Sequence, residues 1–179
     1  MARWCLPCFS AACVVALVQA ARAANEPWGD LASVFFVAKS ENRNQVHYGI
    51  HVDEHCAPVG QAPVFAYWRM LERGPWVTEP LLAREVSAYG FAEQRVTSRD
   101  PQGGRVLVAL KPLAARPIVI ESHMSGGTCV AEAETVVGGA SASLTSVFVQ
   151  LRWPFGVASL TLRGRALDDG RPLREVVHP

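Results

Sequence analysis

Residues 46–53 alternate between apolar side chains and polar or small ones, and no other feature of the sequence constrains the fold as tightly. Side chains of a β-strand point alternately to opposite faces of the sheet, so a period of two predicts a strand with one buried face. The expected buried face carries Val46, Tyr48, Ile50 and Val52, and the opposite face carries His47, Gly49, His51 and Asp53. Residues 64–71 repeat the pattern, with Trp68 on the apolar side.

Short apolar segments recur along the chain at intervals of roughly ten residues, which is typical of strands in all-β domains. We expect further strands near residues 31–38, 94–97, 105–110, 118–122, 128–137, 144–153, 157–165 and 173–177. Turns are expected at residues 41–44, Gly103-Gly104, Gly138-Gly139 and Asp168-Asp169-Gly170. The last of these would close a C-terminal hairpin. The pattern predicts a mainly β fold, either an antiparallel β-sandwich or a flattened, closed β-barrel of about eight or nine strands.

One short helix is predicted to interrupt the strands, at about residues 78–89. Thr78 is a favourable N-cap, Pro80 is tolerated in a first turn, and Gly90 can end the helix. An apolar stripe at helical spacing is formed by Leu82, Val86 and Tyr89. We expect this stripe to pack on the sheet.

The first 23 residues differ from the rest of the chain and have the pattern of a cleavable signal peptide. Arg3 gives a positive start, residues 6–17 form an apolar run, and Ala21-Arg22-Ala23 supplies small residues at the two positions that signal peptidase reads. The alternative is a membrane anchor, but a bilayer span needs about 20 apolar residues and this run is shorter. We expect export to the periplasm or beyond, with cleavage after Ala23, one β-rich domain over residues 24–179, and no transmembrane segment in the mature chain.

Charge and cysteine usage agree with export. Once Arg3 and Arg22 leave with the leader, 15 basic residues face 16 acidic ones, a balance that offers no basic surface to nucleic acid. The cysteines that remain are Cys56 and Cys129, and an oxidising compartment favours a disulfide between them. The alternative is two separate buried thiols. Zinc binding by this pair alone is not expected, because no C-x-x-C spacing exists.

Several segments carry a family resemblance. They are Lys39-Ser40-Glu41-Asn42-Arg43-Asn44 with Val46 and Tyr48, then Pro63-Val64-Phe65-Ala66-Tyr67-Trp68-Arg69, then Leu81-Leu82 with Glu85 and Ala88-Tyr89-Gly90, and finally Gly164, Gly170 and Glu175. Together they resemble a family of exported bacterial proteins known as domain of unknown function family 4833. The resemblance covers most of the chain after the leader and implies an envelope setting and a β-rich fold. It implies no activity, and the histidines of residues 47–55 are not part of its pattern.

Three histidines and an aspartate form the sharpest local constellation. On one continuous strand, His47, His51, Asp53 and His55 would share a face, because every spacing is even. Residues four apart on a strand are about 13 Å apart, too far for three histidines to bind one metal ion. His51 and Asp53, about 7 Å apart, could share an ion with a neighbouring strand. We favour a solvated strand face, predict no metal site, and leave pH sensing as a weaker alternative.

Known catalytic motifs find little support in the sequence. Ser122 and His123 are adjacent, but adjacency does not make a hydrogen-bonded pair. The segment Gly139-Ala140-Ser141-Ala142-Ser143 lacks the final glycine of a nucleophile elbow. No phosphate loop or dinucleotide fingerprint is present, so we expect no cofactor.

A second candidate surface combines polar and aromatic residues of the family-like segments. Aromatic side chains beside arginine and asparagine are typical of sites that bind polar ligands or partners. The candidate binding residues are Asn42, Asn44, Tyr67, Arg69, Glu85 and Tyr89, with Trp68 between two of them. The alternative assigns Trp68 and Tyr89 to the core, the asparagines to a turn, and Arg69 and Glu85 to an ion pair.

These observations favour a non-enzymatic envelope domain that binds a small ligand or an envelope protein. A hydrolase of envelope material with an unrecognised site and a structural or assembly protein remain as alternatives. A pocket lined by aromatic and polar groups would favour ligand binding, whereas a cleft that joins catalytic groups would favour hydrolysis.

Overall fold

A computed structural model describes residues 31, 33–152 and 156–178 of the chain. The predicted leader, its cleavage site at Ala23 and the expected start of the mature domain lie outside the described residues. The strands are β1 (Phe35–Lys39), β2 (Asn42–Ile50), β3 (Val64–Arg69), β4 (Thr78–Pro80), β5 (Phe91–Asp100), β6 (Gly103–Leu110), β7 (Ile118–Ser125), β8 (Thr128–Val137), β9 (Ala140–Arg152), β10 (Gly156–Ala166) and β11 (Pro172–Val177). A short α-helix, α2 (Ala83–Tyr89), follows β4, and a 3-10 turn, η1 (Lys111–Leu113), follows β6. The fold is mainly β, as predicted.

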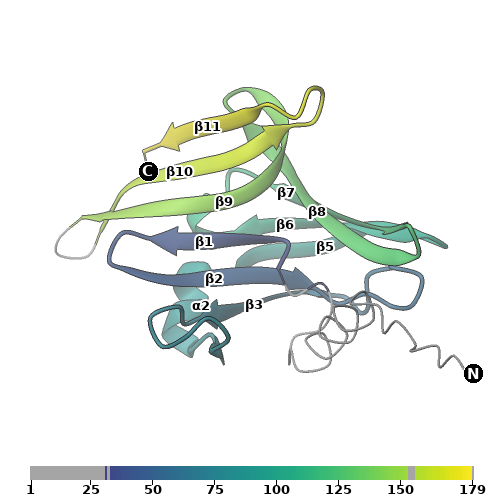
Figure 1. Cartoon of the computed structure of the whole chain (residues 1–179), viewed down its shortest axis with the longest axis horizontal. Coiled ribbons are helices and arrows are strands. Elements are labelled where there is room, and N and C mark those ends of the chain that lie inside the picture. Colours follow the sequence, from purple (N-terminus) through teal and green to yellow (C-terminus); the bar gives the residue numbers. More distant parts are fainter. Residues whose placement is uncertain (1–30, 32, 153–155, 179) are drawn as a thin grey trace, which may run out of the picture. The chain divides into compact units, whose positions relative to one another are not determined.

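All eleven strands belong to one hydrogen-bonded sheet, which divides at β9. The first part of β9 pairs with β8, and its second part pairs in parallel with β1. The strands β4-β3-β2-β1 therefore extend from one half of β9, and β8-β7-β6-β5 extend from the other half. Figure 1 shows these groups as two layers, with β10 and β11 continuing beside β9. The sheet does not close, so the barrel alternative is wrong, and the layers are those of a sandwich. The β1–β9 pair departs from the antiparallel prediction.

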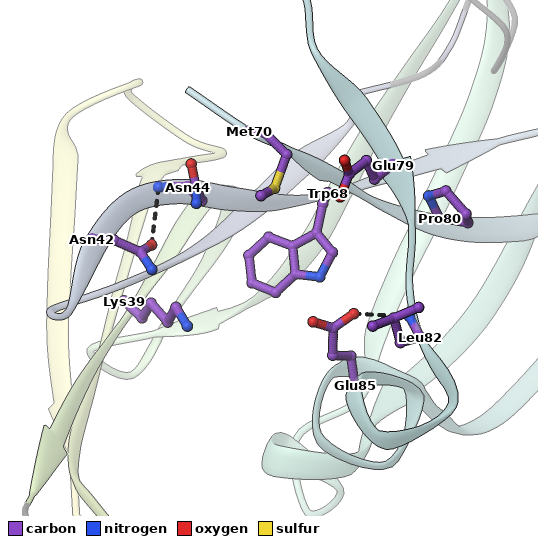
Figure 2. A pocket seen from close by; sticks show the side chains of 9 residues that line it. All are labelled: Lys39, Asn42, Asn44, Trp68, Met70, Glu79, Pro80, Leu82 and Glu85. Carbon is purple, nitrogen blue, oxygen red and sulfur yellow. Dashed lines mark hydrogen bonds between the residues drawn. The ribbon is translucent and has the colours of Figure 1, made fainter. Parts of the chain in front are cut away.

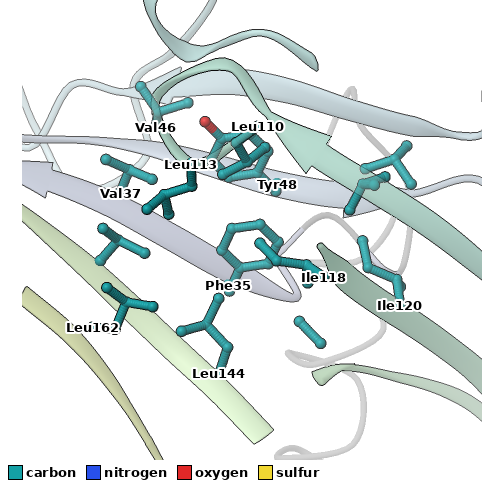
Figure 3. Close-up of a cluster of buried hydrophobic side chains, with 14 of the residues drawn as sticks. Phe35, Val37, Val46, Tyr48, Leu110, Leu113, Ile118, Ile120, Leu144 and Leu162 are labelled. Carbon is teal, nitrogen blue, oxygen red and sulfur yellow. The ribbon is translucent and has the colours of Figure 1, made fainter. Parts of the chain in front are cut away.

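The core lies between the inner faces of the two layers. Phe35 and Tyr48 stack with their ring centroids 4.6 Å apart, and both are fully buried. The buried side chains around them in Figure 3 include Val37, Val46, Leu110, Leu113, Ile118, Ile120, Leu144 and Leu162. The alternating segment 46–50 supplies β2 as predicted, but the strand ends at Ile50 rather than near Asp53. Both faces of β2 are covered from Val46 to Ile50, so His47 is buried as well, whereas Arg43 near the start of the strand is exposed.

The predicted helix is shorter than expected and begins later. Thr78 does not cap it, because residues 78–80 pair with β3 as β4. The helix begins after Leu82, whose backbone N–H donates to Glu85 Oε2 at 2.8 Å. The expected apolar stripe is also wrong in part: Leu82 and Val86 are 54% and 43% exposed, while Tyr89 packs against the core.

Two segments predicted as turns belong to strands. Residues 42–44 open β2, and the turn lies one step earlier, at Ser40 and Glu41. Gly103 and Gly104 open β6. A Cβ atom at Gly103 would lie 2.1 Å from the carbonyl oxygen of Ser122, so glycine allows this close approach of β6 to β7. The turns at residues 138–139 and 168–170 are confirmed, and the chain ends in the expected β10–β11 hairpin.

Side chains tie the two layers together at their margins. The predicted disulfide is present: Cys56, in the loop after β2, is bonded to Cys129 of β8 across 73 positions of sequence. At the open edge of the layers, the Gln94 side chain of β5 forms hydrogen bonds with the backbone of β3 like those that a neighbouring strand would form. Its Oε1 accepts from the Val64 N–H of β3 at 3.0 Å, and its Nε2 donates to the Val64 carbonyl at 2.9 Å.

A partly buried ion pair joins β11 to the segment before β7. Arg116 donates to the Glu175 carboxylate of β11 through both terminal guanidinium nitrogens, Nη1 and Nη2, with Nη2 2.7 Å from Oε1. The Gly138 N–H donates to the same carboxylate at 2.8 Å. The hydrogen bonds from Arg116 and then from Gly138 lower the pKa of Glu175 from 4.5 to about 2. An ionised Glu175 thus joins the C-terminal hairpin to Arg116 and Gly138.

We expect this pair to contribute acid sensitivity. The unfolded chain protonates Glu175 near pH 4.5, whereas the folded protein keeps it charged to about pH 2. Its stabilisation is therefore complete above pH 4.5 and is lost as the pH falls towards 2. Glu175→Gln should cost about 1–2 kcal/mol at neutral pH, and urea titrations should show this difference shrinking as the solution is acidified. The exposed Glu93→Gln is the control. A pH-independent difference for Glu175→Gln would contradict the assignment.

Candidate functional site

A pocket of about 400 Å³ lies between β2, β3, β4 and α2 (Figure 2). Each element supplies side chains because β4 pairs with β3 and leads directly into the helix. The lining residues are Lys39, Asn42, Asn44, Trp68, Met70, Glu79, Pro80, Leu82 and Glu85. Three of the predicted binding residues, Asn42, Asn44 and Glu85, are therefore brought together here.

Trp68 is the most informative residue of this pocket. Its side chain is on the inner face of β3 and is 7% exposed. Its indole Nε1 is the one buried side-chain nitrogen or oxygen of the described residues that has no hydrogen-bond partner. Figure 2 shows this nitrogen on the side of the ring that faces Glu85 and Leu82. Buried donors are nearly always paired in folded proteins, so an unpaired indole N–H at this position is unusual.

The position of the Trp68 ring is fixed from several directions. Tyr89 of α2 meets the ring edge-to-face, with centroids 5.4 Å apart. Lys39 Nζ lies 5.5 Å from the ring centroid, within the range of a cation–π contact. The Tyr48 hydroxyl donates to the Tyr89 carbonyl at 2.7 Å and anchors the end of the helix to β2. The ring is therefore held in place by contacts with Tyr89 and Lys39.

Two asparagines present donors at the opposite side of the pocket. Asn42 Oδ1 accepts from the Asn44 N–H at 3.1 Å, and Asn44 Oδ1 accepts from the Glu72 N–H at 3.1 Å. Both side-chain oxygens are thus engaged by backbone. The side-chain NH2 groups make no hydrogen bond within the described part of the chain, so they remain available as donors.

The charged groups of the pocket have structural partners as well. Glu79 forms an ion pair with Arg73, and Lys39 forms one with Glu41 at 3.3 Å. Glu85 uses Oε2 to accept from the Leu82 N–H. Burial, together with the negative charges of Glu41 and Glu85, raises the pKa of Tyr89, which keeps its hydroxyl neutral. In these contacts Glu79 uses Oε1 and Glu85 uses Oε2, so each carboxylate keeps a second oxygen as an acceptor.

The other predicted binding residues lie elsewhere. Tyr89 is behind Trp68 rather than in the lining. Tyr67 and Arg69 belong to the opposite face of β3 from Trp68, and Tyr67 pairs with His47. Arg69 Nε donates to the Pro75 carbonyl at 3.1 Å, and its guanidinium lies 5.5 Å from the Trp76 ring. The Arg69–Glu85 ion pair, which was the alternative to a binding role, does not occur among the ion pairs of the described residues: Arg69 contacts Pro75 and Glu85 contacts Leu82.

Sequence reasoning placed Trp68 in the core and missed much of the lining. The missed residues are Lys39, Met70, Glu79, Pro80 and Leu82. Their convergence depends on β4, a strand of three residues that the helix prediction had absorbed. The sequence feature that could have indicated this pocket is the apolar strand position of Trp68 together with the family-like asparagine segment. That feature does not reveal that the indole N–H is unpaired.

The histidine constellation is not a shared strand face. His47 is buried in β2, where Nδ1 is 2.6 Å from Ser33 Oγ and Nε2 is 3.0 Å from Gln45 Oε1. Burial and then the charge of Arg69 lower its pKa to about 4, so it is neutral at neutral pH. His51 and His55 follow the end of β2 and are exposed. No group of three or more candidate metal ligands occurs among the described residues.

Ser122 and His123 do not form a catalytic pair. Ser122 is buried and its hydroxyl donates to the Cys56 carbonyl at 2.8 Å, whereas His123 is the next residue of β7 and is exposed. Successive side chains of a strand point to opposite faces, so the two groups diverge.

Within residues 31, 33–152 and 156–178, no helix has the length and hydropathy needed to cross a membrane.

Comparison with known proteins identifies the family alone. No curated protein and no solved structure matches the chain. The family described as Domain of unknown function (DUF4833) matches residues 35–176, which span the sheet from β1 to β11 and include the whole pocket. The matched range also contains the asparagine, Tyr-Trp-Arg and Tyr-Gly segments on which the resemblance was based. The chain therefore belongs to the DUF4833 family.

Proposed function

We propose that this protein is an exported, non-enzymatic component of the bacterial envelope that binds a small ligand in the Trp68 pocket. The supporting observation is the buried Trp68 N–H without a partner at the wall of a cavity. A buried donor left unpaired costs about 1–3 kcal/mol. A ligand acceptor that reached Nε1 would recover that cost, and because Nε1 is buried, the side chains beside it must shift to admit the acceptor.

The lining suggests what such a ligand carries. The donors are the Trp68 N–H and the NH2 groups of Asn42 and Asn44, so the ligand needs at least two acceptor oxygens. Met70, Pro80 and Leu82 supply apolar surface beside these donors. The volume of the pocket is within the range of about 300–1,000 Å³ that is typical of small-molecule sites. We therefore infer a neutral, oxygen-bearing ligand with an apolar part.

Native mass spectrometry of protein purified from a periplasmic preparation tests the proposal. The wild-type protein should carry a co-purified small molecule, and its mass should correspond to a chain that begins at Ala24. Trp68→Phe keeps the ring but removes the N–H, so it should retain about one tenth or less of the bound molecule. Trp76→Phe is the matched control, because Trp76 is 61% exposed and outside the pocket.

Two results would count against ligand binding at Trp68. A wild-type protein without any bound molecule would contradict the proposal that it binds a small ligand. Equal occupancy in Trp68→Phe and the wild type would show that the ligand does not bind at Trp68. A mass that includes residues 1–23 would contradict export independently of either result.

A further inference from the structure

A second pocket, of about 320 Å³, lies on the exposed face of the C-terminal hairpin and is lined by three arginines. Arg163 and Arg165 belong to β10, and Arg174 belongs to β11. All three are exposed, and Arg163 is directly opposite Arg174 in the strand register. Thr145 of β9 completes the polar part of the lining. The hairpin thus concentrates positive charge at one place in a chain of net charge +1.

None of these arginines forms an ion pair within the part of the chain that the structure describes. Five other arginines do have a carboxylate partner; they are Arg73, Arg95, Arg105, Arg116 and Arg171. Among the described residues, only the Arg165 side chain of the three forms a hydrogen bond, a long one of 3.4 Å from Nη1 to the Gly170 carbonyl.

Two acidic residues near these arginines in the sequence form ion pairs with other partners, and Asp168 Oδ1 accepts from the Asp169 N–H. Glu175, adjacent to Arg174, is bound by Arg116 on the opposite face of β11. Asp169, in the hairpin turn, pairs with Arg171 at 3.2 Å. Like charges directly opposite each other on paired strands are destabilising, and here no carboxylate offsets the Arg163–Arg174 repulsion. The three guanidinium groups therefore line one pocket without a carboxylate partner among the described residues.

We propose that the Arg163–Arg165–Arg174 pocket binds a phosphate group. A guanidinium presents a planar fork of N–H donors that matches the oxygens of a phosphate, and it remains charged at every physiological pH. Three such forks around one pocket supply charge complementarity for an anion with more than one negative charge. This site is separate from the Trp68 pocket, so it does not depend on the proposed function.

Isothermal titration calorimetry of the disulfide-bonded protein with inorganic pyrophosphate measures the affinity of the site in solution. A second arm measures co-sedimentation with vesicles of phosphatidylglycerol in phosphatidylcholine, which distinguishes a lipid headgroup from a free phosphate. Arg163→Gln/Arg174→Gln should weaken binding about tenfold or more in the arm that shows it, and added salt should weaken wild-type binding. Arg95→Gln/Arg99→Gln removes the same charge from β5 and should change the affinity less than twofold.

The two arms give decisive outcomes. Binding in either arm that is lost in the Arg163/Arg174 variant and kept in the β5 variant supports the site and identifies its source. Equal losses in both variants would show attraction to net charge alone and would overturn the proposal. Absence of wild-type binding in both arms would overturn it as well. Circular dichroism of each variant separates loss of binding from loss of fold.

Discussion

Replacing Cys56 and Cys129 together by serine is expected to lower the free energy of unfolding by about 4 kcal/mol. The disulfide closes a loop across 73 positions and so restricts the unfolded chain, which in the chain-entropy treatment yields a stabilisation of this size. Domains of this kind are stable by about 5–15 kcal/mol, so the loss would be a large part of the total. Urea denaturation of the double variant and of the wild type, followed by circular dichroism, measures the difference.

The location of the bond adds a local expectation. Cys56 is in the loop between β2 and β3, and Cys129 is in the other layer, so the bond connects segments that share no backbone ladder. Proteolysis of the double variant should begin in residues 51–62. Reduction of the wild type with dithiothreitol should reproduce the destabilisation of the variant. A difference below about 1 kcal/mol would show that the loop is restrained by other contacts.

Leu144→Ala is expected to destabilise the protein by about 3 kcal/mol, within the usual range of about 2–5 kcal/mol for a buried leucine. Leu144 is 1% exposed and lies on β9 at the point where the two layers separate. Its side chain fills the space beside Phe35 and Leu162 in Figure 3. Neither layer can move inward there without breaking its pairing with β9, so the cavity should persist.

Leu167→Ala provides the matched control, because the same atoms are removed from a side chain that is 47% exposed in the β10–β11 turn. We expect it to change the free energy of unfolding by less than about 1 kcal/mol. Thermal unfolding of both variants measures the contrast. Similar losses for the two variants would contradict the placement of Leu144 in the core between the two layers.

Most strands could be predicted from the sequence because their patterning is local. Residues 128–137 are β8 with the expected bounds, and the final hairpin follows from its Asp-Asp-Gly turn. The errors arose where pairing overrides local preference. Thr78 has the chemistry of a helix cap, yet its backbone pairs with Arg69 of β3. Residues 42–44 have the composition of a turn, yet they extend β2.

The candidate site was predicted in part for a similar reason. Asn42, Asn44 and Glu85 were chosen from family-like segments, and the fold brings them to one pocket. Tyr67 and Arg69 are in the same segment as Trp68, but the period of two sends them to the other face of β3. That face could have been excluded from the alternation alone. The unpaired Trp68 N–H could not have been foreseen, because it depends on atoms from β3 and α2 together.

The parallel pairing of β1 with β9 determines the order in which this chain can fold. Phe36 is aligned with Ser146, so the first strand obtains its second neighbour only after most of the polypeptide is available. Contacts between residues so distant in sequence carry a high loop-closure entropy and slow the folding reaction. The hairpins of β5 to β8 can form beforehand, because their partners are adjacent in the chain. A ribosome-bound fragment that stops before β9 would therefore keep β1 paired only with β2, without its native neighbour β9, and the final cooperative step requires the chain from Ala140 onward.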